Sequence, residues 1–351
     1  MCNIAGYAGT EKAAPKLLEM LRRQQAFDGG VCTGIATIHD GRIFYRKVFG
    51  DVDTLINTTD ALNLPGTIGI AHTRPGGNPL TYAFAHPFVT DNEDMAYITN
   101  GTGRGIGYKE KAQEMCTLLE NEGYSFRDRA FVEDAFFPAL KDGSHVSCVE
   151  VRMNMVDRYV KQGKSIPEAI VLTLSQMYTD NVSVLLNLRE PEKIFALRVT
   201  RPMATLMAED GTYMATTRFA FPEGLKGEVM QLPLSHACEI TKDGVTVTDA
   251  VLSGVEPVCE VTPNAYKEGY NRIVKLLTGK KESPLYFDDL EMAVYNDMKD
   301  IWPEQHHLVQ DARLVYDVLW QLKCEGRLKT EMRYMAGSGH TKVRVYMWID
   351  E

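Results

Sequence analysis

Five short apolar runs follow one another closely in the second half of this chain, and they constrain its fold more than any other feature. A meander of short strands, with the helical patterns segregated elsewhere, predicts antiparallel sheets covered by helices. The fold class that we expect is therefore α+β. The five runs span residues 182–188, 194–199, 205–209, 213–217 and 237–241.

The first part of the chain adds a hairpin to this pattern. Residues 33–39 and 42–49 alternate between apolar and polar side chains and are joined by Asp40-Gly41. An Asp-Gly pair between two such runs is the strongest short hairpin signal. Further strands are expected at residues 2–8, 67–72 and 95–99, and helices at residues 14–25, 108–122, 132–141 and 166–178.

The sequence changes character near residues 253–263, where Pro257 and Pro263 flank an extended segment. We therefore expect a first domain at residues 1–252, a linker at residues 253–265 and a C-terminal domain at residues 266–351. Helical patterns followed by an alternating strand resemble a winged helix-turn-helix, so a small winged-helix-like α/β domain is expected. The helices are expected at residues 266–277, 287–298, 310–321 and 323–333, and the strand at residues 342–349.

Charge and cysteine usage narrow the cellular setting. The formal net charge is −9, so nucleic acid and anionic membranes are not the expected partners. No run approaches the ~20 apolar residues that span a bilayer, and the N-terminus lacks the pattern of a signal peptide. The seven cysteines are scattered and form no CxxC pair, which disfavours a disulfide framework or a zinc site. A cytoplasmic protein without cofactor or metal is expected.

Cys2 stands directly behind Met1, which aminopeptidases commonly remove ahead of a small residue. Removal exposes an α-amine with a reference pKa of ~7.7–8.0 beside a thiol with a reference pKa of ~8.5. One residue can then supply both a nucleophile and its general base. If Cys2 is considered without the rest of the sequence, the alternative is that a cysteine stands at the second position by chance.

Cys2 belongs to the first of four short motifs that follow one another along the chain in a specific order. They are MCNIAGYAG at residues 1–9, GIAHTRPGG at residues 69–77, AHPF at residues 85–88 and ITNGTG at residues 98–103. Together they resemble the class II glutamine amidotransferase domain, found in glucosamine-6-phosphate synthases and amidophosphoribosyltransferases. The resemblance covers roughly residues 1–250. It implies a four-layer αββα sandwich of the N-terminal-nucleophile hydrolase type.

The resemblance also implies a role for each matching residue. Cys2 is the nucleophile, and the Asn100 side-chain amide and the Gly101 backbone N–H stabilise the oxyanion. Arg74 binds the α-carboxylate of glutamine, since its planar fork suits a bidentate contact, and Gly76 and Gly77 form the loop beside it. An isolated Asn-Gly would otherwise be an ordinary type I′ turn, and an isolated Arg a surface ion pair.

Two histidines accompany these residues. His86 is assigned to the substrate site, although the His86-Pro87 pair suits structural packing better than acid/base work. His72 precedes Arg74 by two residues, on the same face of a strand, and its role is left open between structure and catalysis. Cys32 is interpreted as an inert, buried thiol.

The chain departs from the family pattern in four places. Asn3 replaces the usual Gly after the nucleophile. The family's Arg-Gly-x-Asp-Ser element is replaced by residues 27–32, where no basic residue stands. The family's Trp-Ala-Thr-His stretch after the binding Arg is replaced by residues 75–78, with one residue fewer, which removes a hydroxyl that contacts glutamine in the family. The Asp that pairs with the substrate α-amine falls at Phe131, and Glu133 or Asp128 are the carboxylates considered in its place.

The function that this pattern indicates is hydrolysis of glutamine to glutamate and ammonia through a Cys2 thioester. No synthase half follows in the chain, so a separate synthase subunit or a second copy of the chain is the expected partner. An acylase on the same scaffold is one alternative. An amino-acid sensor on a degenerate site is the other, and the losses at positions 28 and 131 favour it over an acylase.

The C-terminal domain is expected to be an interaction module, with a structural cap on the first domain as the alternative. Duplex DNA binding is a minority reading, because the charges of residues 257–351 roughly cancel. That reading rests on a basic group near the expected recognition helix and wing: Arg327, Lys329, Arg333, Lys342 and Arg344.

Overall fold

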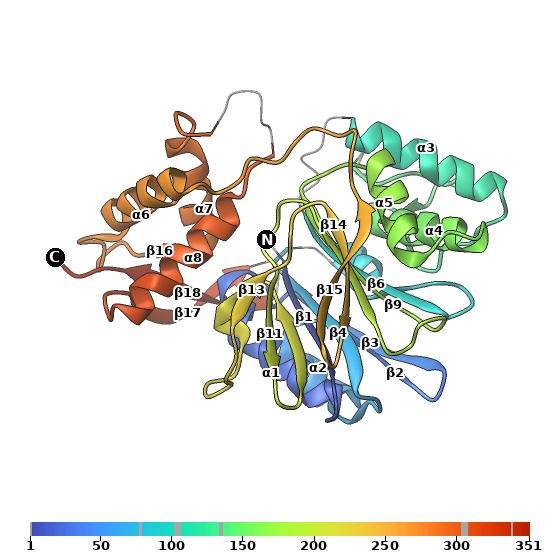
Figure 1. Ribbon diagram of the computed structural model, residues 1–351, viewed down its shortest axis with the longest axis horizontal. Helices are drawn as coiled ribbons and strands as arrows, with labels where there is room; N and C mark the ends of the chain where they lie inside the picture. Colours follow the sequence, from blue (N-terminus) through green and yellow to red (C-terminus); the bar gives the residue numbers. More distant parts are fainter. Residues whose placement is uncertain (1, 77–78, 102–106, 133–135, 303–307, 338–339) are drawn as a thin grey trace.

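Two antiparallel sheets stack at the centre of the protein, as the computed structural model shows for residues 2–76, 79–101, 107–132, 136–302, 308–337 and 340–351 (Figure 1). The first sheet has the order β13-β11-β12-β1-β4-β2-β3 and the second β15-β14-β10-β9-β6-β5. The first comprises β1 (Asn3–Gly9), β2 (Cys32–His39), β3 (Arg42–Phe49), β4 (Ile68–Arg74), β11 (Ala204–Ala208), β12 (Gly211–Ala215) and β13 (Val229–Gln231). The second comprises β5 (Phe88–Val89), β6 (Met95–Gly101), β9 (Asn181–Asn187), β10 (Ile194–Arg198), β14 (His236–Thr241) and β15 (Gly244–Val251).

Helices cover the outer face of each sheet, which gives four layers. Three buried clusters separate these layers: one between the first sheet and its helices, one between the sheets, and one between the second sheet and its helices. The α+β expectation is confirmed. The first sheet is covered by α1 (Ala13–Asp28) and α2 (Val52–Thr58), and the second by α3 (Tyr108–Asn121), α4 (Cys148–Lys161) and α5 (Ile166–Gln176). Smaller elements are β7 (Arg129–Ala130), β8 (His145–Val146), η1 (Ala61–Asn63), η2 (Pro79–Phe84) and η3 (Arg218–Ala220).

Local chemistry explains several element boundaries. Asp40 and Gly41 have φ angles of 45° and 68°, the positive values of a type I′ turn, and they join β2 to β3 as expected. Helix α5 begins with a capping box in which Ser165 and Glu168 bond to each other's backbone N–H. Within the described residues, no helix has the length and apolar character needed to cross a membrane.

A C-terminal unit packs beside the sandwich, and it is defined here as the elements from α6 to β18. Three helices lie against a three-stranded antiparallel sheet of order β16-β18-β17. The elements are α6 (Pro263–Leu277), β16 (Leu285–Tyr286), α7 (Phe287–Asp297), α8 (Asp311–Cys324), β17 (Lys329–Gly337) and β18 (His340–Trp348).

Two expected helices are wrong. The described part of residues 132–141 contains no helix, because Pro138 removes a backbone donor there and Ala139 forms a bridge with His145. Residues 323–333 do not form one helix either. Helix α8 ends at Cys324 in a Schellman motif, in which Gly326 takes a φ of 71° and the N–H of Arg327 bonds to the Leu322 carbonyl at 3.0 Å.

Phe27 joins the sandwich to the C-terminal unit. It lies in the last turn of α1 yet belongs to the apolar cluster of the C-terminal unit. Its ring centroid lies 4.8 Å from that of Phe219, 5.7 Å from that of Tyr316 and 6.4 Å from that of Phe287. The two parts of the chain therefore share one buried core at this point.

Replacing Phe27 by Ala should lower the free energy of unfolding by about 3–5 kcal/mol, since it removes a buried ring and leaves a cavity. Denaturant unfolding measures this loss. Phe131→Ala is the matched control, because that ring is 75% exposed and its removal should change stability by less than about 0.5 kcal/mol. Equal losses in the two variants would contradict the assignment of Phe27 to a shared core.

Candidate active site

Cys2 lies at the start of β1, where the side chain of Asn100 holds its backbone. The Cys2 N–H donates to Asn100 Oδ1 at 3.1 Å, and Asn100 Nδ2 donates to the Cys2 carbonyl at 2.7 Å. Asn100 is buried near the end of β6, in the other sheet. The stacking of the two sheets therefore brings together two residues that are 98 positions apart in the chain.

Gly101 follows Asn100 and pairs with Asn181 of β9. A Cβ atom at Gly101 would lie 2.4 Å from the carbonyl oxygen of Asp180, so only glycine fits there without a shift of the backbone. The Asn100-Gly101 pair is thus the end of a strand, not the centre of an isolated turn. An amide side chain and a strand-end glycine therefore lie beside Cys2, which is the arrangement expected of an oxyanion site.

Asn3, which stands where the family has a glycine, stabilises the local structure through its side chain. It is fully buried, and its Nδ2 donates to the carbonyls of Gln24 at 3.2 Å and Asp28 at 2.7 Å. Gln24 Nε2 donates in return to the Ile4 carbonyl at 2.8 Å. These bonds tie the first residues after Cys2 to the last turns of α1.

Arg74 ends β4, beside β1. Its carbonyl accepts the N–H of Val31 at 3.0 Å, and the neighbouring Thr73 hydroxyl accepts the N–H of Gly30 at 2.8 Å. Arg74 is half-buried, and Gly76 after it is exposed, with no atom within 4 Å of the place where a Cβ would stand. The predicted Gly77 lies outside the described residues. These two hydrogen bonds therefore fix the strand end from which the Arg74 side chain projects.

His72 and His86 form a buried pair of imidazoles, with ring centroids 3.9 Å apart. Burial, with a contribution from Arg74, lowers the pKa of His72 to about 3, and burial together with His72 lowers the pKa of His86 well below its usual range. Both rings are therefore neutral near pH 7, which disfavours an acid/base role. His86 also contacts the Phe88 ring, and its assignment to the substrate site stays a prediction.

The Cys2 thiol is partly buried. Burial raises its pKa, while the charges of the amino terminus, Arg74 and Arg201 lower it and that of Asp288 raises it. A thiol of raised pKa is protonated at neutral pH, so it needs a base before it can attack a carbonyl carbon. The sequence analysis did not identify Arg201 or Asp288, because neither belongs to a local motif.

Three positions concern the carboxylate that the family resemblance predicts for the substrate α-amine. Phe131 is exposed, and Glu133 lies outside the described residues. Asp128 forms an ion pair with Lys47 at 2.7 Å, and Lys47 also donates to the Ala83 and Ala85 carbonyls at 3.2 Å each. To bind an amine, the Asp128 carboxylate would therefore have to pair with that amine and with Lys47 at the same time.

Comparison with known proteins gives relatives of one kind, although no family model matches the chain. The glutamine–fructose-6-phosphate aminotransferase (isomerizing) of Pyrococcus horikoshii is 26% identical over 306 residues, which cover 86% of this chain and 46% of that protein. The enzyme of the same name from Clostridium perfringens is 29% identical over 276 residues, 77% of this chain and 41% of that protein. The chain thus spans less than half the length of these curated relatives.

Solved structures share the fold. The glutamine phosphoribosylpyrophosphate amidotransferase of B. subtilis, complexed with ADP and GMP, has a TM-score of 0.57 and 17% identity, covering 78% of this chain and 58% of that one. A structure of the allosteric regulatory enzyme of purine biosynthesis also has a TM-score of 0.57, with 16% identity over 81% of this chain and 58% of that one. Relatives and fold agree with the four motifs and their geometry. Sequence relatives and shared fold thus support a class II glutamine amidotransferase domain of the N-terminal-nucleophile kind for the sandwich of this chain.

Proposed function

We propose that this protein releases the amide nitrogen of glutamine as ammonia, with Cys2 as the nucleophile once Met1 has been removed. The observation that carries this proposal is the double hydrogen bond between the Asn100 side chain and the Cys2 backbone. It holds the nitrogen that would become the α-amine next to the amide expected to bind the oxyanion. While Met1 is attached, that nitrogen is an amide and cannot act as a base.

The reaction follows from these positions. The α-amine takes the thiol proton, and the sulfur attacks the side-chain amide carbon of glutamine. The negative charge on the oxygen is stabilised by Asn100 Nδ2 and the Gly101 N–H. The C–N bond then breaks, the protonated leaving group departs as ammonia, and a thioester remains. Water adds to the thioester through a second oxyanion, and glutamate leaves with the thiol restored.

A glutamine hydrolysis assay on protein whose N-terminus has been sequenced tests the proposal directly. Processed protein that begins at Cys2 should release glutamate and ammonia in equal amounts. Processed, folded protein with no glutaminase activity, alone or with a synthase, would refute the proposal.

Replacing Arg74 by Lys should raise KM for glutamine by about 10-fold or more with a smaller change in kcat, since an ammonium cannot reproduce a two-pronged carboxylate contact. Steady-state kinetics measures the changes in KM and in kcat separately. Arg46→Lys is the matched control, because Arg46 forms an ion pair with Asp60 away from the Cys2 end of the strands, and its replacement should leave KM unchanged. An unchanged KM in Arg74→Lys would rule out the carboxylate role.

For the C-terminal unit we propose a winged-helix-like domain at residues 266–351, joined to the first domain (residues 1–252) by residues 253–265. The element order α6-β16-α7-α8-β17-β18 and the three-stranded sheet support this classification. In such a fold α8 would be the recognition helix. Its residues before Lys323 are buried or partly buried, which favours a structural cap over a free interaction module.

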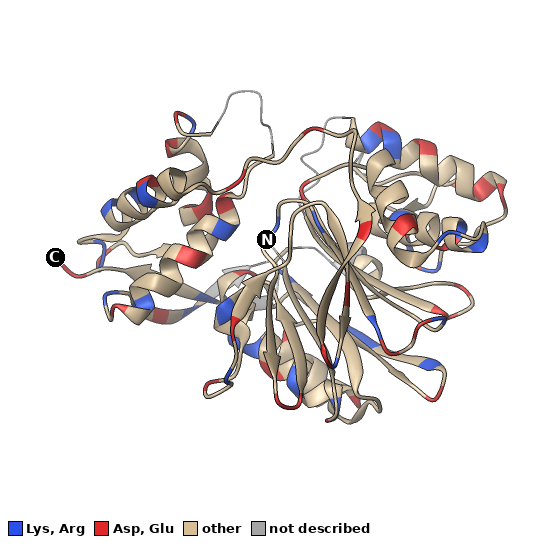
Figure 2. Ribbon diagram, viewed as in Figure 1, with Lys and Arg blue, Asp and Glu red and all other residues tan. Residues whose placement is uncertain are grey.

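The charges of this unit also disfavour DNA binding. Figure 2 shows acidic and basic residues interspersed over it. Arg333 pairs with Glu331 at 2.7 Å and Arg327 with Glu325 at 3.4 Å, so neither is an unpaired phosphate contact. Arg344 is buried. A synthase that receives the ammonia, or a second copy of the chain, remains the partner that we propose.

A further inference from the structure

The sheet of the C-terminal unit has an open edge along β17 (Figure 1). The strand order β16-β18-β17 places β17 at one side of the sheet, and within the described residues no strand pairs with its outer edge. Every residue from 329 to 334 is exposed. An edge strand presents backbone N–H and C=O groups that another strand can bond, so this edge is a template for pairing.

One face of β17 is apolar as well as exposed. Met332 is 66% exposed and Tyr334 is 76% exposed. Met332 stands opposite Val345 of β18, whose side chain is buried in the apolar cluster of the C-terminal unit. The apolar face of the sheet therefore continues from β18 onto β17 but loses its cover there. Two large apolar side chains, two positions apart on an open edge, indicate a contact surface.

The other face of β17 carries two opposite charges. Glu331 and Arg333 are two positions apart, so they share a face, and their side chains pair at 2.7 Å. Arg333 also lies over the ring of Tyr346, 5.0 Å from its centroid. Both charged side chains are exposed, at 51% for Glu331 and 42% for Arg333, so each can contact a second molecule as well.

The order of these residues makes β17 complementary to itself in one antiparallel register. When Met332 lies opposite Met332 of a second copy, Glu331 faces Arg333 of that copy and Arg333 faces its Glu331. Opposite charges directly across an antiparallel pair stabilise it, and like charges destabilise it. The four charges then alternate in sign. Both copies use the same surface, as an interface with two-fold symmetry requires.

The neighbouring registers are unfavourable. If Glu331 lay opposite its own copy, two carboxylates would face each other and Lys329 would face Arg333. If Arg333 lay opposite its own copy, two guanidinium groups would meet. A slip by one residue would set the charged face of one strand beside the apolar face of the other. The residue pattern of β17 therefore selects the register centred on Met332.

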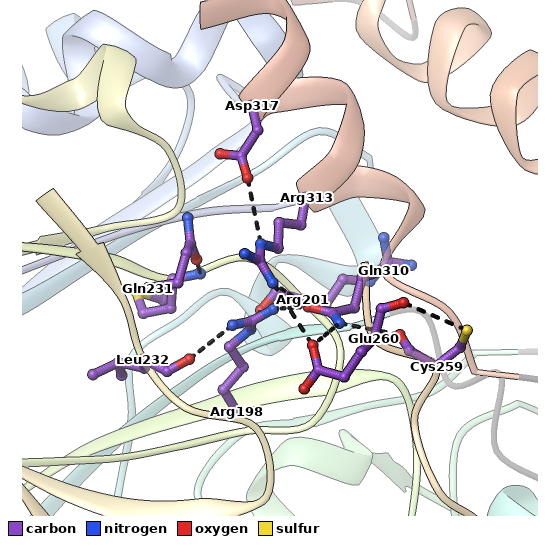
Figure 3. Close-up of polar contacts among 10 residues, drawn as sticks. Arg198, Arg201, Gln231, Leu232, Cys259, Glu260, Gln310, Arg313 and Asp317 are labelled. Carbon is purple, nitrogen blue, oxygen red and sulfur yellow. Dashed lines mark hydrogen bonds and ion pairs between the residues drawn. The ribbon is translucent and has the colours of Figure 1, made fainter. Parts of the chain in front are cut away.

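The helices of the C-terminal unit are already used by contacts within the chain. Figure 3 shows polar contacts that hold the start of α8 to the sandwich. Arg198 of β10 donates to Gln310 Oε1, and Gln310 Nε2 donates to the Cys259 carbonyl at 3.1 Å. Arg201 pairs with Glu291 of α7 at 2.7 Å. The open sheet edge, and not these helices, is therefore the surface that the unit offers to another molecule.

We propose that two copies of this chain associate through β17, which pairs antiparallel with itself across a two-fold axis at Met332. The two three-stranded sheets then form one continuous sheet. Backbone hydrogen bonds between the two edges hold the copies together, and the pairs between Glu331 and Arg333 select the register. This assigns a surface to the second copy that was proposed as a partner, and it does not depend on the chemistry at Cys2.

Charge reversal in two separate variants tests the proposal, with sedimentation velocity over a range of concentrations as the measurement. The unaltered chain should form a dimer. Glu331→Arg and Arg333→Glu each turn two attractive cross-strand pairs into two repulsive ones, so each should raise the dimer dissociation constant by about 10-fold or more. An equal mixture of the two variants should form a heterodimer, because a positive strand then faces a negative one.

The mixture separates a contact between chains from an effect within one chain. In each single variant, positions 331 and 333 carry like charges, so damage to the strand itself would persist in the mixture. Recovery of the dimer can come only from pairing between two different chains. Arg129→Glu is the matched control: it reverses one member of an exposed ion pair with Asp142 on the sandwich and should leave the dissociation constant unchanged.

Met332→Lys tests the position of the two-fold axis. The side chain is exposed, so the fold should tolerate the change, but two like charges would then lie opposite each other at the axis. The dissociation constant should rise by about 10-fold or more.

Three results would each overturn the inference. They are an unaltered chain that is monomeric at the highest concentration at which it stays soluble, a mixture of the charge variants that stays monomeric, and a dimer unaffected by Met332→Lys. None of these readouts uses turnover. A processed chain that dimerises without glutaminase activity would refute the proposed function and support this inference, and an active monomer would do the reverse.

Discussion

Cys2→Ala is expected to abolish glutamine hydrolysis, with a loss of at least ~10⁴-fold in kcat, because no other group can form the thioester. The glutamine analogue 6-diazo-5-oxo-norleucine should label Cys2 in the unaltered protein and fail to label the variant. Glutamate release and peptide mass spectrometry measure the two effects. Binding of glutamine should survive, since Arg74 and the surrounding strands are untouched.

Cys32→Ala is the matched control for this experiment. Cys32 is 1% exposed and stands opposite Arg74 in β2, close to the site but packed among Val31 and Ala85. Its replacement should leave turnover within a few-fold of normal, because a buried thiol of this kind is inert. Hydrolysis at an unchanged rate by protein that retains Met1 would contradict the role of the α-amine as base.

Asn100→Ala should lower kcat by about 10²–10³-fold with a smaller effect on KM, because the oxyanion forms only after substrate is bound. The alanine variant also loses the two bonds that hold the Cys2 backbone. Asn100→Asp keeps the oxygen that accepts the Cys2 N–H but removes the Nδ2 donor, and with it both the oxyanion contact and the bond to the Cys2 carbonyl. Steady-state kinetics on both variants gives the comparison.

A loss in kcat of similar size in the aspartate and alanine variants would assign the effect to the Nδ2 donor. If Asn100→Asp retained nearly normal kcat, the side chain would act through the bond that its oxygen accepts from the Cys2 N–H. A change confined to KM in either variant would remove Asn100 from the chemical step altogether. The thermal stability of the two variants, measured in parallel, excludes unfolding as the cause.

Local signals predicted most of the sandwich strands. The alternation on either side of Asp40-Gly41 predicted a hairpin, and the positive φ angles of both residues confirm it. The five runs between residues 182 and 241 correspond to β9, β10, β11, β12 and β14, with ends that differ by one or two residues. These elements were predictable because their patterns depend on neighbours in the chain and on one buried face.

Helix α4 (Cys148–Lys161) was not anticipated, for a physical reason. Its first residues alternate between apolar and polar, as a strand would, yet nearly all of them are buried in the helix. A helix covered on most sides lacks the single apolar stripe that reveals an amphipathic one. The error at residues 323–333 is of another kind, because a glycine that ends α8 stands inside an otherwise helical pattern.

The sequence by itself predicted a nucleophile, an oxyanion pair and a carboxylate-binding arginine, and these roles stay predictions. Cys2, Asn100, Gly101 and Arg74 each belong to a short motif whose residue types suit the chemistry. Only the tertiary structure decided what surrounds them. Arg201 and Asp288 come from segments roughly 200 and 290 residues beyond Cys2, and no local pattern marks them. The packing of the C-terminal unit against the sandwich, through Glu291, Arg344 and Phe27, brings these distant segments together in the folded chain.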